Sequence, residues 1–360
     1  MPTTATSVCS AGRHGCQGAA WKSRPRRCSA STPRRCWART WGWTRGRSRR
    51  SEMRAPSVGR CSTAVADAPA MAKVHLVDGT FELFRCFHGA PRHTNARGEE
   101  VGAVRGLLHT LLSLLKGLKT HLDDASPAYL AVAFDPLPAA RGGTATDPGT
   151  LIRRQSGLAL DAVRALGIPL WPMVRFQADD ALATGANRLA ADADVEKVVI
   201  CTTDTDLFQC IRDERVVVLD RIRKAITDEA RFRERYGIAP WQFPDYLALV
   251  GAPAKGLPGI PGWGPKSASR MLEAHGRIED FPATDDWIDL PRRRRLAAEF
   301  VARRDEAFLV KRLATLRDDL PLDCSLPALA WRGLDGERLC KVVANAEADD
   351  LWERIERWSG

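Results

Sequence analysis

The segment Val198-Val199-Ile200-Cys201-Thr202-Thr203-Asp204-Thr205-Asp206-Leu207 decides the fold. Its β-branched run predicts a buried strand of a parallel sheet. Two carboxylates, Asp204 and Asp206, follow where the strand ends. In open α/β sheets, the functional groups gather beyond the carboxyl ends of the strands. An isolated Asp-x-Asp is more typical of a solvated loop, so a functional interpretation requires other strands that end in the same way.

Two earlier apolar runs also end in aspartate. Val74–Val77 is followed by Asp78, and Tyr129–Phe134 is followed by Asp135. Between them, apolar residues recur with helical spacing from residue 101 to residue 118, which predicts a long amphipathic crossover helix. A right-handed crossover places both aspartates at the same edge of one sheet. We therefore expect an α/β fold built on a parallel sheet.

The next part of the chain continues this alternation. The pattern predicts a helix over about residues 151–166, which carries Arg153 and Arg154, and residues 167–172 are expected to lead into another short strand. A second helix starts at Gln177-Ala178-Asp179-Asp180 and leads to the strand 197–201. Carboxylates in a first helical turn commonly cap the helix, so capping is the structural alternative for Asp179 and Asp180.

Six carboxylates are thus predicted to lie at one edge of the sheet: Asp78, Asp135, Asp179, Asp180, Asp204 and Asp206. So many like charges repel each other unless cations bridge them. Ligand sets made only of oxygen suit Mg²⁺ or Mn²⁺. The surrounding sequence shows no Ser/His or Cys/His nucleophile pattern and no Walker-type loop. Metal-assisted hydrolysis of a phosphodiester is the chemistry that this set favours.

A second module follows. Residues 251–266 contain five glycines and four prolines between a predicted helix at 246–250 and another that starts at Ser267. A glycine-rich turn that enters a helix exposes backbone N–H groups to a phosphate, and Gly262-Trp263-Gly264 followed by Lys266 fits this pattern. An ordinary loop between helices is the alternative. The arginines at 292–295 and 303–304 either follow a duplex backbone or form a solvated helix face.

Charge is concentrated in residues 1–70, which hold 14 basic and 2 acidic residues, a net charge of +12, whereas the remaining chain holds 40 basic and 42 acidic residues. The first 70 residues contain no Leu, Ile, Phe or Tyr, so they cannot bury enough apolar surface to fold. We expect a disordered basic segment: an arm for nucleic acid, a plain tail, or sequence upstream of the true start near Met71.

Five further cysteines, Cys86, Cys201, Cys210, Cys324 and Cys340, show no metal-ligand pairing and are expected to be reduced thiols. No apolar run reaches the roughly 18 residues that a membrane span needs, and no signal-peptide core is visible. The expectation is a cytoplasmic protein without a membrane partner.

Several motifs together resemble the 5′–3′ exonuclease and flap endonuclease family, which includes the N-terminal nuclease domain of bacterial DNA polymerase I. The resemblance runs from about Lys73 to Pro321. The matching segments are Leu76–Gly79, Phe87-His88, Phe134-Asp135, Ala165–Pro169, Ala178–Asp180, Asp204–Leu207, Asp245–Leu249, Leu257–Lys266 and Leu313–Arg317.

The resemblance implies a PIN-like nuclease domain over 71–240, a helix–three-turn–helix DNA-binding module over 241–325 and a helical tail over 326–360. It implies two divalent metals, Mg²⁺ or Mn²⁺, and a K⁺ ion in the DNA-binding module. The implied catalytic residues are Asp78, Asp135, Asp179, Asp180 and Arg85. The implied metal ligands are Asp78, Asp135, Asp179, Asp180, Asp204, Asp206 and Gln177. The implied DNA-binding residues are Gly259, Gly262, Gly264, Lys266, Ser267, Arg153 and Arg154.

The chain departs from the family pattern in three places. The family's glutamate before Ala-Asp-Asp is Gln177, which removes one negative charge. Two further family aspartates, implied ligands of the second metal, are Ala252 and Lys255. The arch that clamps the 5′ strand is reduced to residues 136–150, and Arg153 and Arg154 are candidates to replace its cations. The Lys255 ammonium either takes the place of the second metal or points to solvent or to a DNA phosphate.

The leading expectation is a divalent-metal nuclease that acts on DNA 5′ ends or flaps, with weakened activity. The alternative is a DNA-structure-binding pseudonuclease with little or no catalysis. A third class, an RNA-cutting PIN toxin, fits the α/β half but leaves the Gly/Pro-rich module unexplained. The expected partners are a DNA duplex with a 5′ end or flap and a polymerase encoded as a separate protein, and the chain is expected to be monomeric.

Overall fold

The computed structural model of the protein describes residues 71–120, 128–136, 147–282 and 290–359. All of them belong to one unit, Ala68–Gly360. The predicted basic segment 1–70 and residues 137–146 of the predicted reduced arch lie outside the described residues.

The described residues form a six-stranded sheet in the order β3-β2-β1-β4-β5-β6. The strands are β1 Ala72–Asp78, β2 Tyr129–Phe134, β3 Leu170–Pro172, β4 Val195–Cys201, β5 Val216–Asp220 and β6 Ala225–Thr227. The first five run parallel, and for β1 to β4 this agrees with the sequence prediction. The last, β6, pairs antiparallel with β5, so the predicted parallel sheet carries one antiparallel strand at this edge. The sequence pattern had given no signal for β5 or β6.

The position of β1 explains where the aspartates gather. It lies between β2 and β4, with Asp78 opposite Ala133 of β2 and Val77 opposite Cys201 of β4. Asp135 follows β2 by one residue, and Thr202 follows β4 directly. Three parallel strands therefore deliver their terminal polar residues to one edge, at the point where the strand order changes direction.

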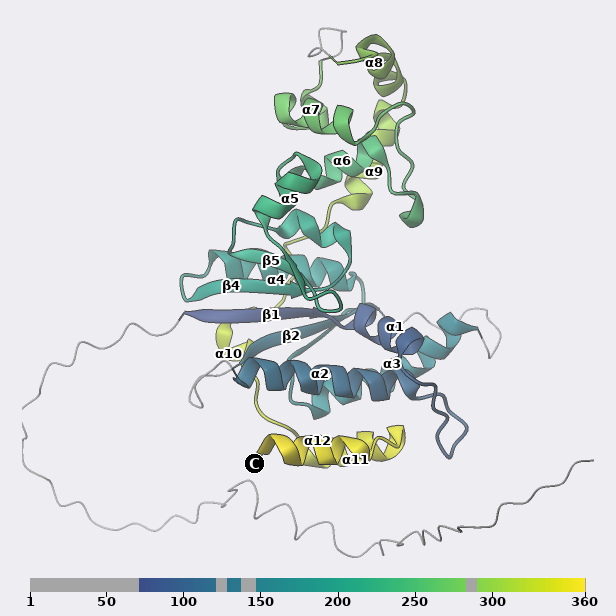
Figure 1. Cartoon of the computed structure of the whole chain (residues 1–360), viewed down its shortest axis with the longest axis vertical. Helices are drawn as coiled ribbons and strands as arrows, with labels where there is room; N and C mark the ends of the chain where they lie inside the picture. Colours follow the sequence, from purple (N-terminus) through teal and green to yellow (C-terminus); the bar gives the residue numbers. More distant parts are fainter. Residues whose placement is uncertain (1–70, 121–127, 137–146, 283–289, 360) are drawn as a thin grey trace, which may run out of the picture. The chain divides into compact units, whose positions relative to one another are not determined.

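Helices cover both faces of the sheet (Figure 1). Their bounds are α1 Gly79–Gly89, α2 Gly102–Thr120, α3 Pro148–Ala165, α4 Ala178–Ala191, α5 Glu229–Tyr236, α6 Phe243–Val250, α7 Pro265–His275, α8 Arg293–Ala302, α9 Arg304–Ala314, α10 Leu326–Leu329, α11 Gly336–Ala346 and α12 Asp350–Ser359. Within the described ranges, no helix combines the length and apolar character needed to cross a bilayer.

Alternating side chains of the strands divide the core in two. Ala131 and Ala133 of β2 contribute to a cluster with α4, whereas Leu130, Val132 and Phe134 contribute to a cluster with α1, α2 and α3. This period of two, with both sets fully buried, is expected for a strand covered on both faces. Both layers pack on β1 and β2, so the core sets the positions of Asp78 and Asp135.

The chain after β6 is helical. In this module α6 packs against both α7 and α9. Buried Trp263 lies in the turn before α7, where its Nε1 donates a hydrogen bond of 3.2 Å to the Leu296 carbonyl and its ring stacks on Phe281. The turn is therefore anchored by an aromatic core while its glycines remain near the surface.

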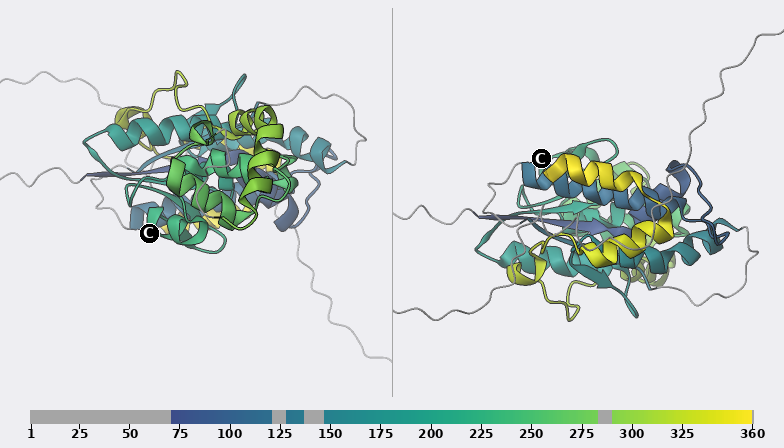
Figure 2. Two further views of the ribbon diagram at one scale, coloured as in Figure 1. Left: turned by 90° about the horizontal axis from the view of Figure 1, so that it is seen from above. Right: turned by 90° about the horizontal axis from the view of Figure 1, so that it is seen from below.

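The last helices return to the sheet domain. The Trp331 amide donates to the Ala128 carbonyl at 2.8 Å, and the Asp335 amide donates to the Ala165 carbonyl at 2.9 Å. From there α11 packs on α3 and α2, and α12 packs on α2 (Figure 2, yellow). Leu339, Val343 and Leu351 join the buried cluster that contains α2 and α3. The predicted helical tail is thus packed into the core of the sheet domain.

Candidate active site

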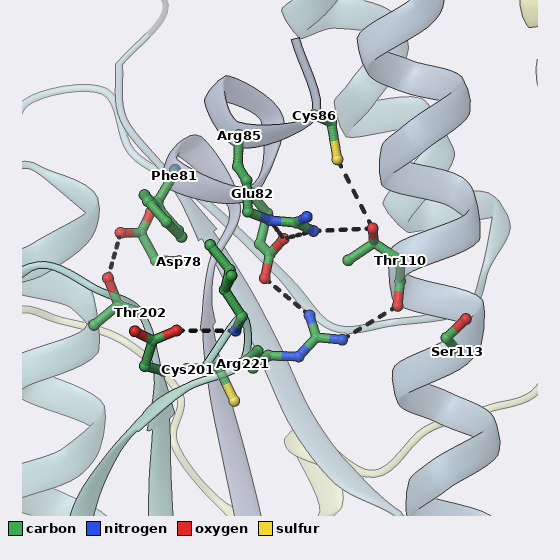
Figure 3. A network of polar contacts seen from close by, with 12 residues as sticks. Asp78, Phe81, Glu82, Arg85, Cys86, Thr110, Ser113, Cys201, Thr202 and Arg221 are labelled. Atoms are coloured by element: carbon green, nitrogen blue, oxygen red, sulfur yellow. Dashed lines mark hydrogen bonds and ion pairs between the residues drawn. The ribbon is translucent and has the colours of Figure 1, made fainter. Parts of the chain in front are cut away.

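Asp78 is the most constrained carboxylate at this edge. It ends β1 and caps α1, where its Oδ1 accepts the Phe81 N–H at 2.8 Å. Its Oδ2 accepts the Thr202 hydroxyl at 3.0 Å (Figure 3). Burial raises the pKa of Asp78 to about 6, against the lowering effect of these two hydrogen bonds. The two donors fix the orientation of both oxygens.

Asp135 connects β2 to α4. Its Oδ1 accepts the N–H of Ala178, the first residue of α4, at 2.8 Å. Its own backbone N–H donates to Thr80 Oγ1 at 2.8 Å. The carboxylate therefore satisfies one of the free N–H groups at the start of α4, and this bond holds the helix against the strand end.

Asp179 lies in the first turn of α4 and experiences the charge of the other carboxylates. Burial, and after it the negative charges of Asp78, Asp204, Asp135 and Asp206, together raise its pKa to about 8. The negative charges of these five side chains therefore act on one another electrostatically. Keeping them all ionised is costly without a cation.

Asp180 and Gln177 differ from the rest of the predicted set. The Asp180 carboxylate accepts the Gln177 N–H at 3.1 Å and the Arg317 N–H at 3.0 Å. Asp180 therefore has the structural role of a cap and also ties down the segment after α9. Gln177 is the N-cap residue of α4 and its side chain is exposed. The capping alternative describes the structural role of Asp180, and its function as a metal ligand stays a prediction.

Lys255 approaches the cluster from the helical module. Its Nζ forms ion pairs with Asp204 Oδ1 and, at 2.8 Å, with Asp206 Oδ1. These contacts agree with the first alternative for Lys255, in which its ammonium takes the place of the second metal. The ammonium does not point away into solvent. Asp204 also accepts the Asp206 N–H at 2.9 Å, so both carboxylates are fixed on the 3-10 turn that follows β4.

A buried ion-pair network lies beside Asp78 (Figure 3). The Glu82 side chain is 2% exposed and lies between two arginines. It accepts from Arg85 Nε at 2.9 Å and from Arg221 Nη1 at 2.9 Å. Arg85 Nη2 also donates to Thr110 Oγ1 at 3.0 Å. Glu82 therefore holds two guanidinium groups in fixed positions on the α1 side of the carboxylate cluster.

The predicted phosphate-binding turn is ordered by its own backbone. Gly264 caps α7, and its N–H donates to Ser267 Oγ at 3.0 Å. Gly262 has a φ of +84°, a left-handed conformation that favours glycine. Gly259 packs against the Val250 carbonyl so closely that a Cβ would collide with it. Lys266 is exposed at the start of α7.

Arg153 and Arg154 lie on α3. Arg153 donates to Thr150 Oγ1 at 2.8 Å. Arg154 is exposed and lines a cavity of about 770 Å³ together with Thr94, Glu99 and other residues. The structure places these arginines at the helix that follows the predicted reduced arch, and a role in binding DNA stays a prediction.

The residues fit a hard divalent cation by their chemistry, because every predicted ligand offers oxygen. As the side chains of the described residues stand, no three His, Cys, Asp or Glu converge closely enough to hold an ion. Burial and the neighbouring carboxylates raise the pKa of Asp179, and a cation bound there would favour its ionised form.

Four residues near this site carried no recognisable signal in the sequence: Thr80, Glu82, Thr202 and Arg221. Thr202 was within the segment that predicted the strand end, but a threonine at a strand end is unremarkable. Glu82 follows the N-cap Asp78 by four residues and looks like an ordinary first-turn acid. Only the fold brings Arg221, 139 residues later, to its carboxylate.

Known families and relatives match most of this chain. Residues 73–237 match the family model described as 5′–3′ exonuclease, N-terminal resolvase-like domain, and residues 238–337 match 5′–3′ exonuclease, C-terminal SAM fold. DNA polymerase I of Rhizobium leguminosarum is 32% identical over 78% of this chain, and that of Pseudomonas aeruginosa is 34% identical over 72%. The chain spans only 28% of the length of each of these relatives.

Among solved structures, a T5 5′-exonuclease with bound zinc has a TM-score of 0.52 and 18% identity, covering 76% of this chain and 98% of that chain. At that identity the likeness shows the fold alone. It confirms the predicted combination of a PIN-like α/β domain with a helical module.

Proposed function

Because this chain belongs to the 5′–3′ exonuclease family, we propose that it hydrolyses DNA phosphodiesters at 5′ ends or 5′ flaps with the help of Mg²⁺ or Mn²⁺. The observation that carries the proposal is the position of Asp78, Asp135 and Asp204 at the carboxyl ends of β1, β2 and β4, along one edge of the sheet. Hard oxygen ligands at a sheet edge, without a side-chain nucleophile, suit hydrolysis by an activated water.

The chain's own residues have distinct proposed roles. Asp78, Asp135 and Asp179 would hold the divalent ion, which when bound supplies a hydroxide and stabilises the leaving oxygen. Thr202 and the Phe81 amide keep the Asp78 carboxylate oriented, and the Ala178 amide does the same for Asp135. These donors reduce the reorganisation that ion binding requires.

Arg85 and Arg221 are the proposed phosphate-facing cations. Glu82 fixes both guanidinium groups without exhausting their donors, since each guanidinium carries five N–H groups. An oriented guanidinium recognises a phosphate through two parallel hydrogen bonds. We propose that Arg85 contacts the phosphate that is cleaved; the resemblance implies a catalytic role for this residue without giving its target.

We propose that the helical module binds the DNA. Its turn presents glycine backbone at Gly259, Gly262 and Gly264 with exposed Lys266 beside the start of α7, an arrangement suited to a phosphate. Ser267 supports the turn by accepting the Gly264 N–H. A K⁺ ion in this turn and a separate polymerase partner stay predictions, as do the domain limits at 240 and 325 and a monomeric, cytoplasmic protein.

The test is cleavage of a 5′-labelled flap DNA by the full chain, first with Mg²⁺ and then with Mn²⁺. Asp135→Asn is the site variant. Asp161→Asn, an exposed carboxylate on α3 paired with Arg164, is the matched control. We expect metal-dependent cleavage in the wild type and in the control, and a loss of at least 100-fold in Asp135→Asn. Equal cleavage by all three proteins would exclude this site.

A second candidate is a DNA-structure-binding protein with little catalysis. The ion pairs of Lys255 with Asp204 and Asp206 favour it, because they leave less negative charge for a second metal. Tight binding of flap DNA without cleavage in either metal would establish this candidate. Cleavage of RNA but not of flap DNA would instead support a PIN-type ribonuclease.

A further inference from the structure

Lys255 is held in place by a tight turn. It ends the 3-10 turn Pro253–Lys255, and its N–H donates to the Ala252 carbonyl at 2.9 Å. The following Gly256 has a φ of +70°, and the Leu257 N–H returns to the same Ala252 carbonyl at 3.2 Å. The loop that starts at the end of α6 therefore aims one lysine at the strand edge.

The two carboxylates that pair with the Lys255 ammonium, those of Asp204 and Asp206, are also held in place. Asp204 caps the turn after β4, and its N–H donates to Thr202 Oγ1 at 3.1 Å. The buried Oδ1 of Asp206 has no hydrogen bond of good geometry, and the ammonium 2.8 Å away is the charge that compensates it. Without the ammonium, this oxygen would be left buried and uncompensated, which is strongly unfavourable.

One ammonium and one divalent ion cannot occupy this place together. A magnesium ion needs oxygens at about 2.0–2.1 Å around itself, which is the space that the ammonium fills. The lysine also reduces the charge of the Asp204–Asp206 pair from −2 to −1, and a second cation would be repelled at this short distance. The ammonium therefore leaves the Asp204–Asp206 pair with a net charge of −1 for any further cation.

We propose that Lys255 is a resident cation that occupies the Asp204–Asp206 half of the carboxylate cluster, so that the chain binds one divalent ion, at the Asp78–Asp135–Asp179 half. The inference rests on the proposed function, whose metal site it refines. Lys255 belongs to the helical module that is proposed to bind DNA, so the second cation would be supplied by the DNA-binding loop itself.

The test measures binding of Mn²⁺ to the full chain without DNA, by electron paramagnetic resonance of the free ion. We expect one Mn²⁺ per wild-type chain. Lys255→Ala should bind a second Mn²⁺, or bind it at least tenfold more tightly, and Lys255→Asp more tightly still. Lys255→Arg, which keeps the charge, should bind one. Lys341→Ala removes a surface lysine from an ion pair on α11 and should match the wild type.

Two results would overturn the inference: two ions on the wild type, or the same number and affinity on Lys255→Ala as on the wild type. Circular dichroism of each variant shows whether it folds, and Lys255→Met is the replacement if the alanine variant does not. Failure of the proposed nuclease function is distinguishable. In that case no variant cleaves DNA in either metal, while the step from one ion to two on removal of Lys255 persists.

Discussion

Thr202 and Asp78 join the two central strands of the sheet at their carboxyl ends, through a hydrogen bond of 3.0 Å from Thr202 Oγ1 to Asp78 Oδ2. Both residues are buried, with exposed fractions of 2% and 5%. The bond lies beside the proposed metal site and does not itself depend on a metal. It therefore offers a way to disturb the orientation of one ligand without removing it.

Thr202→Val should lower kcat for flap cleavage by 10- to 100-fold, the range typical for loss of a group that orients a ligand. The Thr202 bond lowers the pKa of Asp78, so its loss should also move the acidic limb of the pH–rate profile to higher pH. Thr203→Val is the neighbouring control. A uniform loss of activity at every pH would mean that the hydroxyl only supports the fold.

Glu82→Gln should destabilise the protein by about 3 kcal/mol, because it leaves the partly buried guanidinium groups of Arg85 and Arg221 without their carboxylate partner. Chemical denaturation monitored by circular dichroism measures the change. The control is Glu337→Gln, which removes an exposed pairing with Lys341 and should cost less than about 0.5 kcal/mol. A change of that small size in Glu82→Gln would contradict the network.

The metal-free protein should become less stable as the pH rises from about 4 to about 8. The folded-state pKa values of Asp179, about 8, and Asp78, about 6, both lie above 3.8. The folded chain therefore retains protons that the unfolded chain has already released, and stability falls with pH across this window. Thermal unfolding in chelator, at several pH values, tests the slope.

Asp179→Asn should make the metal-free protein more stable at pH 8, by on the order of 1–2 kcal/mol, because it removes a carboxylate that is costly to ionise beside four others. Saturating Mn²⁺ should reverse this order, since the wild type gains stability from the ion and the variant gains less. If Asp179→Asn were less stable than the wild type without metal at pH 8, the carboxylate would already be well compensated in the folded chain.

Lys266→Ala should weaken binding to duplex DNA similarly for all sequences and should reduce the salt dependence of log K by about one unit. Fluorescence anisotropy over a range of salt concentrations measures both quantities. Lys224→Ala, an exposed lysine in the turn between β5 and β6, is the control. An unchanged salt slope in Lys266→Ala would show that the lysine contacts no phosphate.

The strand ends were predictable because burial on both faces and a terminal aspartate leave a strong local pattern, as for Val74–Asp78 and Tyr129–Asp135. The Lys255 contact was foreseen only as one of two alternatives, since 51 residues separate it from Asp204 and no local pattern records such a pairing. Helix α1 and strands β5 and β6 were not predicted. The strand β5 is five residues long and β6 only three, which is too short for a periodic signal.

The return of α11 and α12 to the helices under β1 and β2 changes how the helical module can move. A module joined by one linker can swing freely, but this one is entered after β6 and left after α9, and both connections lead back to the same sheet domain. It is a double-anchored insertion. Any displacement produced by DNA on α7 must therefore be taken up at two chain crossings, and it would also act on the ion pairs by which Lys255 joins the module to the sheet domain.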